Sequence, residues 1–344
     1  MNRLRLPSAL RRAVCALALS MPFAAIAQEK VDTLTEFRVS TAQSAVFPLG
    51  RAAERWAQLV NDKAGRAFAL KTYPGATLAN RDPLREFGAL RDGGADLAVG
   101  SALAWSAQLP AFAVYALPWL AAESREQVAL AASDAVRDAI AARADAAGVV
   151  VLAVAPLGER VLATTRGPVL APADLSGVDV RVVASPLLIE SLATLGARPA
   201  SMNLPDAQSA FAAGTLGGQE APASTLAAMR IAALGPRFVT RWGAFADVMV
   251  FAVRRAVWER WSAEQRASVQ AAAVEAARET AAIASEESAL ADLTRQGVTI
   301  VRITPAQRAA LRAAVQPVWS KWTTQIGADL VDAAEAAVAG AAAK

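Results

Sequence analysis

Two arginines have the side-chain chemistry of a carboxylate-binding site. Arg181 lies within the apolar run 178–183, and Arg160 follows shortly after the apolar run 149–155. An arginine at the end of a strand lies near the sheet edge where α/β proteins bind their ligands. Its planar guanidinium can donate two parallel hydrogen bonds to one carboxylate. Because a buried guanidinium without a partner is costly, we expect an anion to meet each of these arginines.

That anion could also belong to the protein. Asp174 and Asp179 lie close to Arg181 in the sequence. A structural ion pair with either of them, or with a nearby glutamate, is the alternative to a bound ligand. The spacing alone leaves both possibilities open.

The composition excludes much of ordinary enzyme chemistry. The chain has no histidine and one cysteine, Cys15. Because the chain after Cys15 contains neither histidine nor cysteine, it cannot form His-based triads, thiol nucleophiles, disulfides or Cys/His zinc sites. The common hydrolase, phosphate-loop, dinucleotide and zinc-protease motifs are absent, and Gly214, Gly217 and Gly218 lack the dinucleotide spacing. We expect no enzymatic activity and no cofactor, and assign no metal ligand. An enzyme using Asp/Glu chemistry is the alternative.

The excess of basic residues lies at the N-terminus. The chain has 35 Lys and Arg against 31 Asp and Glu, a formal net charge of +4. Four arginines and no acid fall within the first 27 residues, so 31 basic and 31 acidic residues remain beyond them. A balanced chain lacks the electrostatic pattern of a nucleic-acid-binding protein. We therefore expect no nucleic-acid partner.

The first 27 residues have the three parts of a secretory signal peptide. Basic residues come first, the apolar run 13–19 follows, and Ala25-Ile26-Ala27 forms a small-residue cleavage signal. The apolar run is shorter than the roughly 20 residues of a membrane-spanning helix. The sequence thus predicts that residues 1–27 are removed and that the mature protein is periplasmic.

Short strands alternate with helices along the rest of the chain, which favours an α/β protein with mostly parallel sheets. A chain of this length is typical of two domains. Predicted strands cover 37–41, 68–73, 95–99, 149–155 and 178–183, and predicted helices cover 48–64, 83–91 and 123–146.

A long stretch near the C-terminal end contains no proline or glycine. Residues 256–295 are rich in Ala, Glu and Arg. As one helix they would extend roughly 60 Å, longer than a small domain, which suggests a strut between two lobes. Two helices with an unmarked break are the alternative.

Several motifs resemble, in order, those of the TRAP-transporter solute receptors, the DctP-like periplasmic family. The segment 174–181, Asp-Leu-Ser-Gly-Val-Asp-Val-Arg, resembles that family's D-L-x-G-x-x-x-R. The segments 195–202 and 210–220 resemble its L-G-A-x-P-x-x-M and A-L-x-x-G…D-G-x-E. Further matches in the same order are found at 73–75, 94–97, 116–119 and 158–160.

The resemblance implies a two-lobed, periplasmic-binding-protein-like α/β fold with a long helix crossing both lobes. It places lobe 1 at 28–157 plus 247–285, and lobe 2 at 158–246 plus 286–344. It implies capture of an organic carboxylate for the membrane permease subunits of a TRAP transporter, with Arg181 pairing with the carboxylate and Arg160 as a second anion contact. We expect a monomer. The alternative is that the protein is an exported receptor whose partner is a sensor kinase and not a permease.

The chain also departs from the family pattern. Gly217 stands in place of the Asp of D-G-x-E, and Ala221 stands where many relatives have a polar or aromatic residue. Ser101 and Ala104 stand where relatives that bind sialic acid place charges, which disfavours a polyhydroxylated sugar acid. We expect Glu220 to be structural.

The predicted pocket is therefore poor in polar groups. Its expected lining, besides the two arginines, is Trp105, Trp242, Ser40, Asn80, Ser101 and Ala221, with Trp119 as a further candidate. Ordinary core packing is the alternative for each tryptophan. Such a lining favours a small monocarboxylate with an apolar or aromatic body.

Overall fold

The computed structural model describes residues 35–64, 68–283 and 286–342. The predicted signal peptide at 1–27 lies outside the described residues. No helix within the described residues is long and apolar enough to cross a membrane.

The described strands form one mixed sheet in the order β2-β1-β3-β8-β4-β7-β5-β6, with β9 paired to β8. Their bounds are β1 Thr35–Thr41, β2 Phe68–Tyr73, β3 Leu97–Ser101, β4 Val149–Thr164, β5 Asp179–Val182, β6 Arg198–Ser201, β7 Gly218–Pro222, β8 Phe238–Arg254 and β9 Thr299–Arg302. The α/β class is confirmed. The sheet is less parallel than expected, because β8 is antiparallel to β3 and β4, and β4 is antiparallel to β7.

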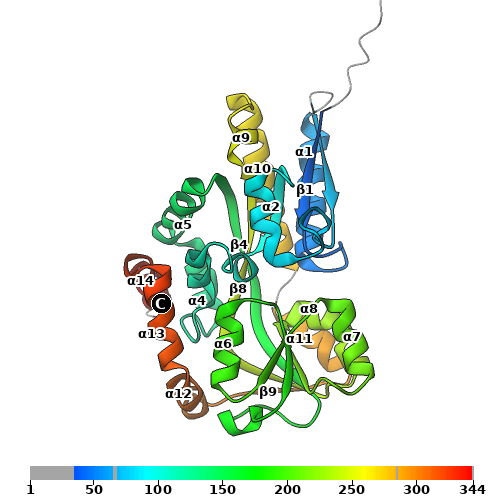
Figure 1. Ribbon diagram of the computed structural model, residues 1–344, viewed down its shortest axis with the longest axis vertical. Helices are drawn as coiled ribbons and strands as arrows, with labels where there is room; N and C mark the ends of the chain where they lie inside the picture. Colours follow the sequence, from blue (N-terminus) through cyan, green and yellow to red (C-terminus); the bar gives the residue numbers. More distant parts are fainter. Residues whose placement is uncertain (1–34, 65–67, 284–285, 343–344) are drawn as a thin grey trace, which may run out of the picture. The chain divides into compact units, whose positions relative to one another are not determined.

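β4 and β8 are the long central strands, and they run through both halves of the sheet (Figure 1). Their pairing is interrupted between Val151 and Ala153, between Pro156 and Gly158, and between Arg160 and Leu162. The sequence predicts only the first part of β4, because Pro156 and Gly158 are signals that usually end a strand. Here they lie at an irregular point, and the strand continues beyond them.

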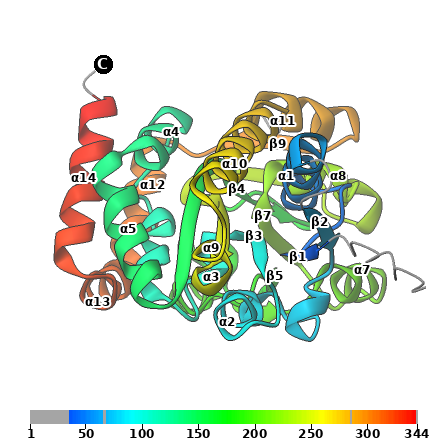
Figure 2. The ribbon, with the colours of Figure 1, turned by 90° about the horizontal axis from the view of Figure 1, so that it is seen from above.

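The α-helices cover both faces of the sheet (Figure 2). They are α1 Pro48–Ala64, α2 Glu86–Asp92, α3 Ala102–Trp105, α4 Ser124–Ala132, α5 Asp134–Ala146, α6 Pro186–Thr194, α7 Leu204–Ala212, α8 Ala223–Ala228, α9 Arg255–Trp258, α10 Ala263–Ile283, α11 Glu286–Arg295, α12 Pro305–Ala314, α13 Gln316–Ile326 and α14 Ala328–Ala342. Short 3₁₀ helices lie at Thr77–Ala79, Pro83–Arg85, Pro110–Ala116, Pro172–Leu175 and Ile231–Leu234.

The amphipathic pattern of 48–64 correctly predicts α1. Its apolar face packs on the sheet and on α10, where Trp56 is fully buried and its ring meets that of Phe251 edge to face at 5.4 Å between centroids. The Trp56 indole N–H donates to the Val269 carbonyl of α10 at 3.1 Å. This hydrogen bond joins two helices that lie about 200 residues apart in the sequence.

The segment 256–295 is not one helix. It forms α9, α10 and α11, and residues 259–262 between α9 and α10 are not helical. Ser262 and Gln265 exchange side-chain to backbone hydrogen bonds, a capping box that begins α10. α10 contacts α1 and β4, whereas α11 contacts α8 and β9. The predicted strut is therefore made of successive helices that serve the two halves of the sheet.

The predicted helix 123–146 is also divided, into α4 and α5. Ser133 lies between them, with an extended backbone, and its hydroxyl accepts from the Val136 N–H. Serine as an N-cap satisfies a free N–H of the second helix. Both helices contact α14, which lies beside them in Figure 2.

The predicted lobe boundaries at 157/158 and 246/247 fall inside β4 and β8. Gly158 pairs with Asp247, next to one of the interruptions in the β4–β8 pairing. The described residues all belong to one compact unit. The division into the two stated sets of residues therefore stays a prediction.

Candidate functional site

The C-terminal ends of two groups of parallel strands meet the middle of β4 and β8. In one group, β3 ends at Ser101, which pairs with Met249 of β8. In the other, β7 ends at Pro222, which pairs with Arg160 of β4. Open α/β sheets bind ligands outside the carboxyl ends of their strands. The region around Arg160 and Asp247 is therefore where both groups would present a ligand site.

Arg160 lies at this point and is paired with two buried acids. Its Nε and Nη2 donate to the Glu220 carboxylate at 2.8 and 2.7 Å, and its Nη1 donates to Asp247 Oδ2 at 3.0 Å. Arg160 is 4% exposed, and both carboxylates are buried as well. Burial raises the pKa of Glu220, against the opposing effect of the Arg160 charge. The expected structural position of Glu220 agrees with this geometry.

Asp247 links the arginine to the other half of the sheet. Its Oδ2 also accepts from the Ser101 hydroxyl at 2.6 Å, and its Oδ1 accepts from the backbone N–H groups of Leu103 and Val248 at 3.2 and 2.9 Å. Burial raises its pKa, while Arg160 and these donors oppose the rise. The network Ser101–Asp247–Arg160–Glu220 thus joins β3, β8, β4 and β7.

Arg181 has a different environment. It is 7% exposed, and its Nε donates to the Met202 carbonyl at 3.0 Å. Neither terminal nitrogen has a hydrogen bond or a carboxylate partner among the residues that the structure describes. Burial, and then the positive charge of Arg160, lower the Arg181 pKa to about 10, and Glu220 opposes this.

The acids that could have paired with Arg181 are engaged elsewhere. Asp179 accepts from Arg198 Nε at 2.9 Å, and Asp174 accepts the backbone N–H groups of Leu170 and Ala171 at 2.8 and 2.9 Å. The structural alternative raised by the sequence therefore applies to Arg160 and not to Arg181.

Ser40 and Trp105 belong to a second buried polar group, centred on Glu86. The Ser40 hydroxyl donates to Glu86 Oε1 at 2.8 Å, and the Trp105 indole N–H lies 3.3 Å from Oε2. All three side chains are at most 1% exposed. Burial raises the Glu86 pKa to about 7, and these two donors oppose the rise. Trp105 also packs edge to face on Phe112, which is the core packing named as the alternative for this residue.

Trp242 and Trp119 support the backbone beside Arg160. The Trp242 indole N–H donates to the Arg160 carbonyl at 3.2 Å, and that of Trp119 donates to the Trp242 carbonyl at 2.9 Å. Their rings meet edge to face at 6.1 Å between centroids. Both are almost fully buried. Their contacts are also those of core residues, and ligand contact by either stays a prediction.

The remaining predicted residues divide between the interior and the surface. Ala221 on β7 is buried. Asn80 is exposed and has a left-handed backbone with φ 58°. The structure thus brings Arg160 and Ser101 into one network, places Ser40 and Trp105 in another, and leaves Asn80 outside both.

Sequence reasoning missed Asp247, although a signal was present. It is the only charged residue between Arg241 and Arg254, and an acid inside a buried strand needs a cation. Three polar groups near the strand ends were missed too: Thr41 Oγ1, Gln219 Oε1 and Ser224 Oγ are buried, with no hydrogen-bond partner in the described part of the chain. Within the same residues, no three His, Cys, Asp or Glu side chains form a candidate metal site.

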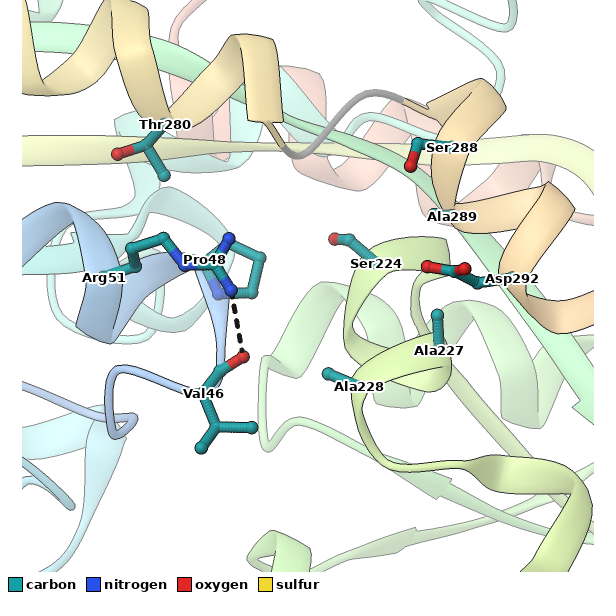
Figure 3. A pocket seen from close by; sticks show the side chains of 10 residues that line it. All are labelled: Val46, Pro48, Arg51, Ser224, Ala227, Ala228, Thr280, Ser288, Ala289 and Asp292. Atoms are coloured by element: carbon teal, nitrogen blue, oxygen red, sulfur yellow. Dashed lines mark hydrogen bonds between the residues drawn. The ribbon is translucent and has the colours of Figure 1, made fainter. Parts of the chain in front are cut away.

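A crevice of about 290 Å³ lies between α1, α8, α10 and α11 (Figure 3). One wall is formed by the segment at the start of α1, with Val46, Pro48 and Arg51. The facing wall is formed by α8 and α11, with Ser224, Ala227, Ala228, Ser288, Ala289 and Asp292. Thr280 lies near the end of α10. None of the predicted binding residues is among those that line it.

The sequence and the fold of the chain were compared with those of known proteins. The family described as bacterial extracellular solute-binding protein, family 7 (DctP) matches residues 39–325. A TRAP periplasmic solute-binding protein from Ralstonia eutropha H16, solved with bound (S)-2-acetolactate, is 38% identical, with a TM-score of 0.85 over 89% of this chain and 99% of that one.

Two further relatives show the same relationship. The C4-dicarboxylate-binding periplasmic protein DctP of Vibrio cholerae is 26% identical over 295 residues, 84% of this chain and 86% of its own. A TRAP solute-binding protein from Ochrobactrum anthropi, whose C-terminus is bound in its ligand pocket, is 25% identical, with a TM-score of 0.77 over 91% and 97% of the two chains. The chain therefore belongs to the family 7 solute-binding proteins: it is a two-lobed periplasmic receptor of the TRAP type for small organic acids, and not an enzyme.

Proposed function

We propose that this receptor binds a small monocarboxylate and that Arg181 holds the carboxylate. The observation that carries the proposal is the buried guanidinium of Arg181, whose terminal nitrogens have no partner in the described chain. Burial without a counter-ion lowers the pKa of Arg181 to about 10. A carboxylate reverses this effect by supplying both charge and acceptors.

The expected affinity follows from the same geometry. Charge-assisted hydrogen bonds contribute about 1.5–3 kcal/mol each, and a guanidinium can donate two of them to one carboxylate. Micromolar binding requires about 8 kcal/mol in total. Two such bonds and the burial of a small apolar body reach that value, since each buried CH₂ adds about 0.8 kcal/mol.

The size and polarity of the ligand are supported by a relative and by the local composition. The Ralstonia eutropha protein was solved with (S)-2-acetolactate, a small branched monocarboxylate. In this chain, the buried residues Ala221 and Ala223 lie near the end of β7 and at the start of α8, and neither has a polar side chain. A branched 2-hydroxy or 2-oxo monocarboxylate fits these features better than a sugar acid.

Arg160 is a weaker candidate for direct contact. Three of its five N–H groups are used by Glu220 and Asp247, which leaves one hydrogen on each terminal nitrogen. Contact between Arg160 and the ligand thus stays a prediction.

The proposal is tested by calorimetric titration of purified Arg181→Ala with (S)-2-acetolactate, 2-oxobutanoate, 2-hydroxybutanoate and galacturonate. We expect a small monocarboxylate to bind the native protein at micromolar concentration, with a loss of at least about a hundredfold in the variant. Arg198→Ala is the matched control, because that arginine is exposed and already paired with Asp179 on the neighbouring strand. Unchanged binding in folded Arg181→Ala would contradict the proposal.

We propose that the partner of this receptor is a pair of membrane permease subunits, as in the family to which the chain belongs. We also propose that the receptor is a monomer. Uptake of the identified acid by membrane vesicles that carry the permease should depend on added receptor. A receptor that binds its acid but stimulates no uptake would favour the alternative partner, a sensor kinase. Light scattering of the liganded and ligand-free protein measures the oligomeric state.

A further inference from the structure

The buried charges around the site balance one another before any ligand binds. Arg160 and Arg181 supply two positive charges, and Glu220 and Asp247 supply two negative ones, with none of the four more than 7% exposed. The neighbouring acid Glu159 is paired with Arg241 at 2.9 Å and adds no net charge. A ligand with one carboxylate therefore brings these four groups to a net charge of −1, and a ligand with two carboxylates brings them to −2, in a buried region where charge interactions are poorly screened.

Asp247 is the residue that produces this balance. Glu220 alone would neutralise Arg160, since it takes Nε and Nη2 of the guanidinium in a parallel pair. Asp247 then occupies Nη1 of the same arginine at 3.0 Å. It is held there by the hydroxyl of Ser101 and by two backbone N–H groups, so its carboxylate has a fixed position.

We propose that Asp247 makes the receptor selective for monoanions, by occupying the face of Arg160 that the second carboxylate of a dianion would need. Within the described residues, the two terminal nitrogens of Arg181 then make no hydrogen bond, whereas both of those of Arg160 do, so Arg181 would accommodate the single carboxylate. This inference rests on the proposed function of Arg181 and deepens it, because it names the residue that sets the charge of the ligand.

Matched pairs of acids that differ by one carboxylate test this selectivity. The probes are 2-oxobutanoate with oxaloacetate, and 2-hydroxybutanoate with malate, titrated calorimetrically into the full mature chain. We expect the native protein to bind the monocarboxylate of each pair more tightly. In Asp247→Asn, the ratio of the two dissociation constants should move toward the dicarboxylate by at least about tenfold, because one negative charge is removed and Nη1 of Arg160 is released.

Asp179→Asn is the matched control. It makes the same change of charge on β5, the strand that carries Arg181, but at an exposed carboxylate paired with Arg198. We expect it to leave the ratio unchanged within about twofold. An unchanged ratio in folded Asp247→Asn, or an equal change in both variants, would overturn the inference.

The native protein provides a test that does not depend on the folding of a variant. If it binds oxaloacetate or malate as tightly as the matching monocarboxylate, the inference is wrong. Failure of the proposed function would give a different result. Either the native protein would bind neither (S)-2-acetolactate nor any of the four probes, or Arg181→Ala would still bind. Loss of all binding in Arg181→Ala, together with an unchanged ratio in Asp247→Asn, would leave the proposed function standing and refute only the role of Asp247.

Discussion

Arg160 and Arg181 are the same residue type and are buried to a similar extent, yet their surroundings differ. Arg160 lies on a central strand, with two carboxylates on its guanidinium. Arg181 lies on β5, two strands away, with one carbonyl on Nε and free terminal nitrogens within the described chain. A buried cation paired inside the protein holds structure together, whereas one left unpaired is available to an external anion. The comparison shows that partners, rather than burial, separate a structural arginine from a binding one.

Removal of the Arg160 side chain should have the largest effect on stability. Arg160→Met leaves Glu220 and Asp247 buried without a cation, which should lower the free energy of unfolding by about 3–5 kcal/mol. Urea unfolding of the ligand-free protein measures the change. A loss below about 1 kcal/mol would mean that the ion pairs are not structural.

Glu86 extends the comparison to a buried acid whose hydrogen-bond partners in the described chain are the neutral side chains of Ser40 and Trp105. Because burial raises its folded pKa from 4.5 to about 7, the folded state holds the proton more tightly than the unfolded state. The resulting stabilisation is complete below pH 4.5 and is lost as the pH rises through 7, a loss of about 3 kcal/mol. Glu86→Gln should remove this dependence, so the difference between the unfolding free energies of the variant and the native protein should change between pH 4.5 and pH 8. Parallel pH profiles would contradict this assignment.

Arg181→Met should behave in the opposite way to Arg160→Met. It removes a buried charge that no carboxylate of the described chain pairs with directly, so the stability of the ligand-free protein should change by at most about 1 kcal/mol. The stabilisation by added ligand should disappear at the same time. Thermal unfolding with and without saturating acid measures both effects, and a strong destabilisation of the ligand-free variant would show that Arg181 is structural.

Ser101→Ala should have a much smaller effect on stability than Arg160→Met. It removes one of several hydrogen bonds to Asp247 and the cap that the same hydroxyl provides to the Ala104 N–H of α3, each worth about 1 kcal/mol, and leaves the Arg160 pair in place. Urea unfolding should show this small loss. A loss as large as that of Arg160→Met would mean that Ser101, rather than Arg160, fixes the position of Asp247.

The sequence predicts those parts of the fold in which local pattern and tertiary structure agree. The bounds of α1 and β2 are predicted correctly, because their apolar periodicities are clear and Pro48 and Gly75 mark turns. The break at Ser133 was missed, and a break within 256–295 was stated only as an alternative without a position, since serine is a weaker signal than proline or glycine. The capping patterns at Ser133 and Ser262 could have revealed both.

The site was only partly predictable for a related reason. Arg181 and Arg160 can be found from their places at strand ends, but whether each has an internal partner depends on strands far away in the sequence. Asp247 lies 87 residues from Arg160 and Glu220 lies 60 residues from it. Their contact follows from the antiparallel pairing of β4 with β7 and β8, which the alternation of strands and helices did not reveal.

The position of β8 in the sheet has a consequence for the time course of folding. β8 lies between β3 and β4, although both precede it in the chain, and it ends only at Arg254. The two halves of the sheet therefore cannot join until most of the chain is available, and pairings over such sequence distances form slowly.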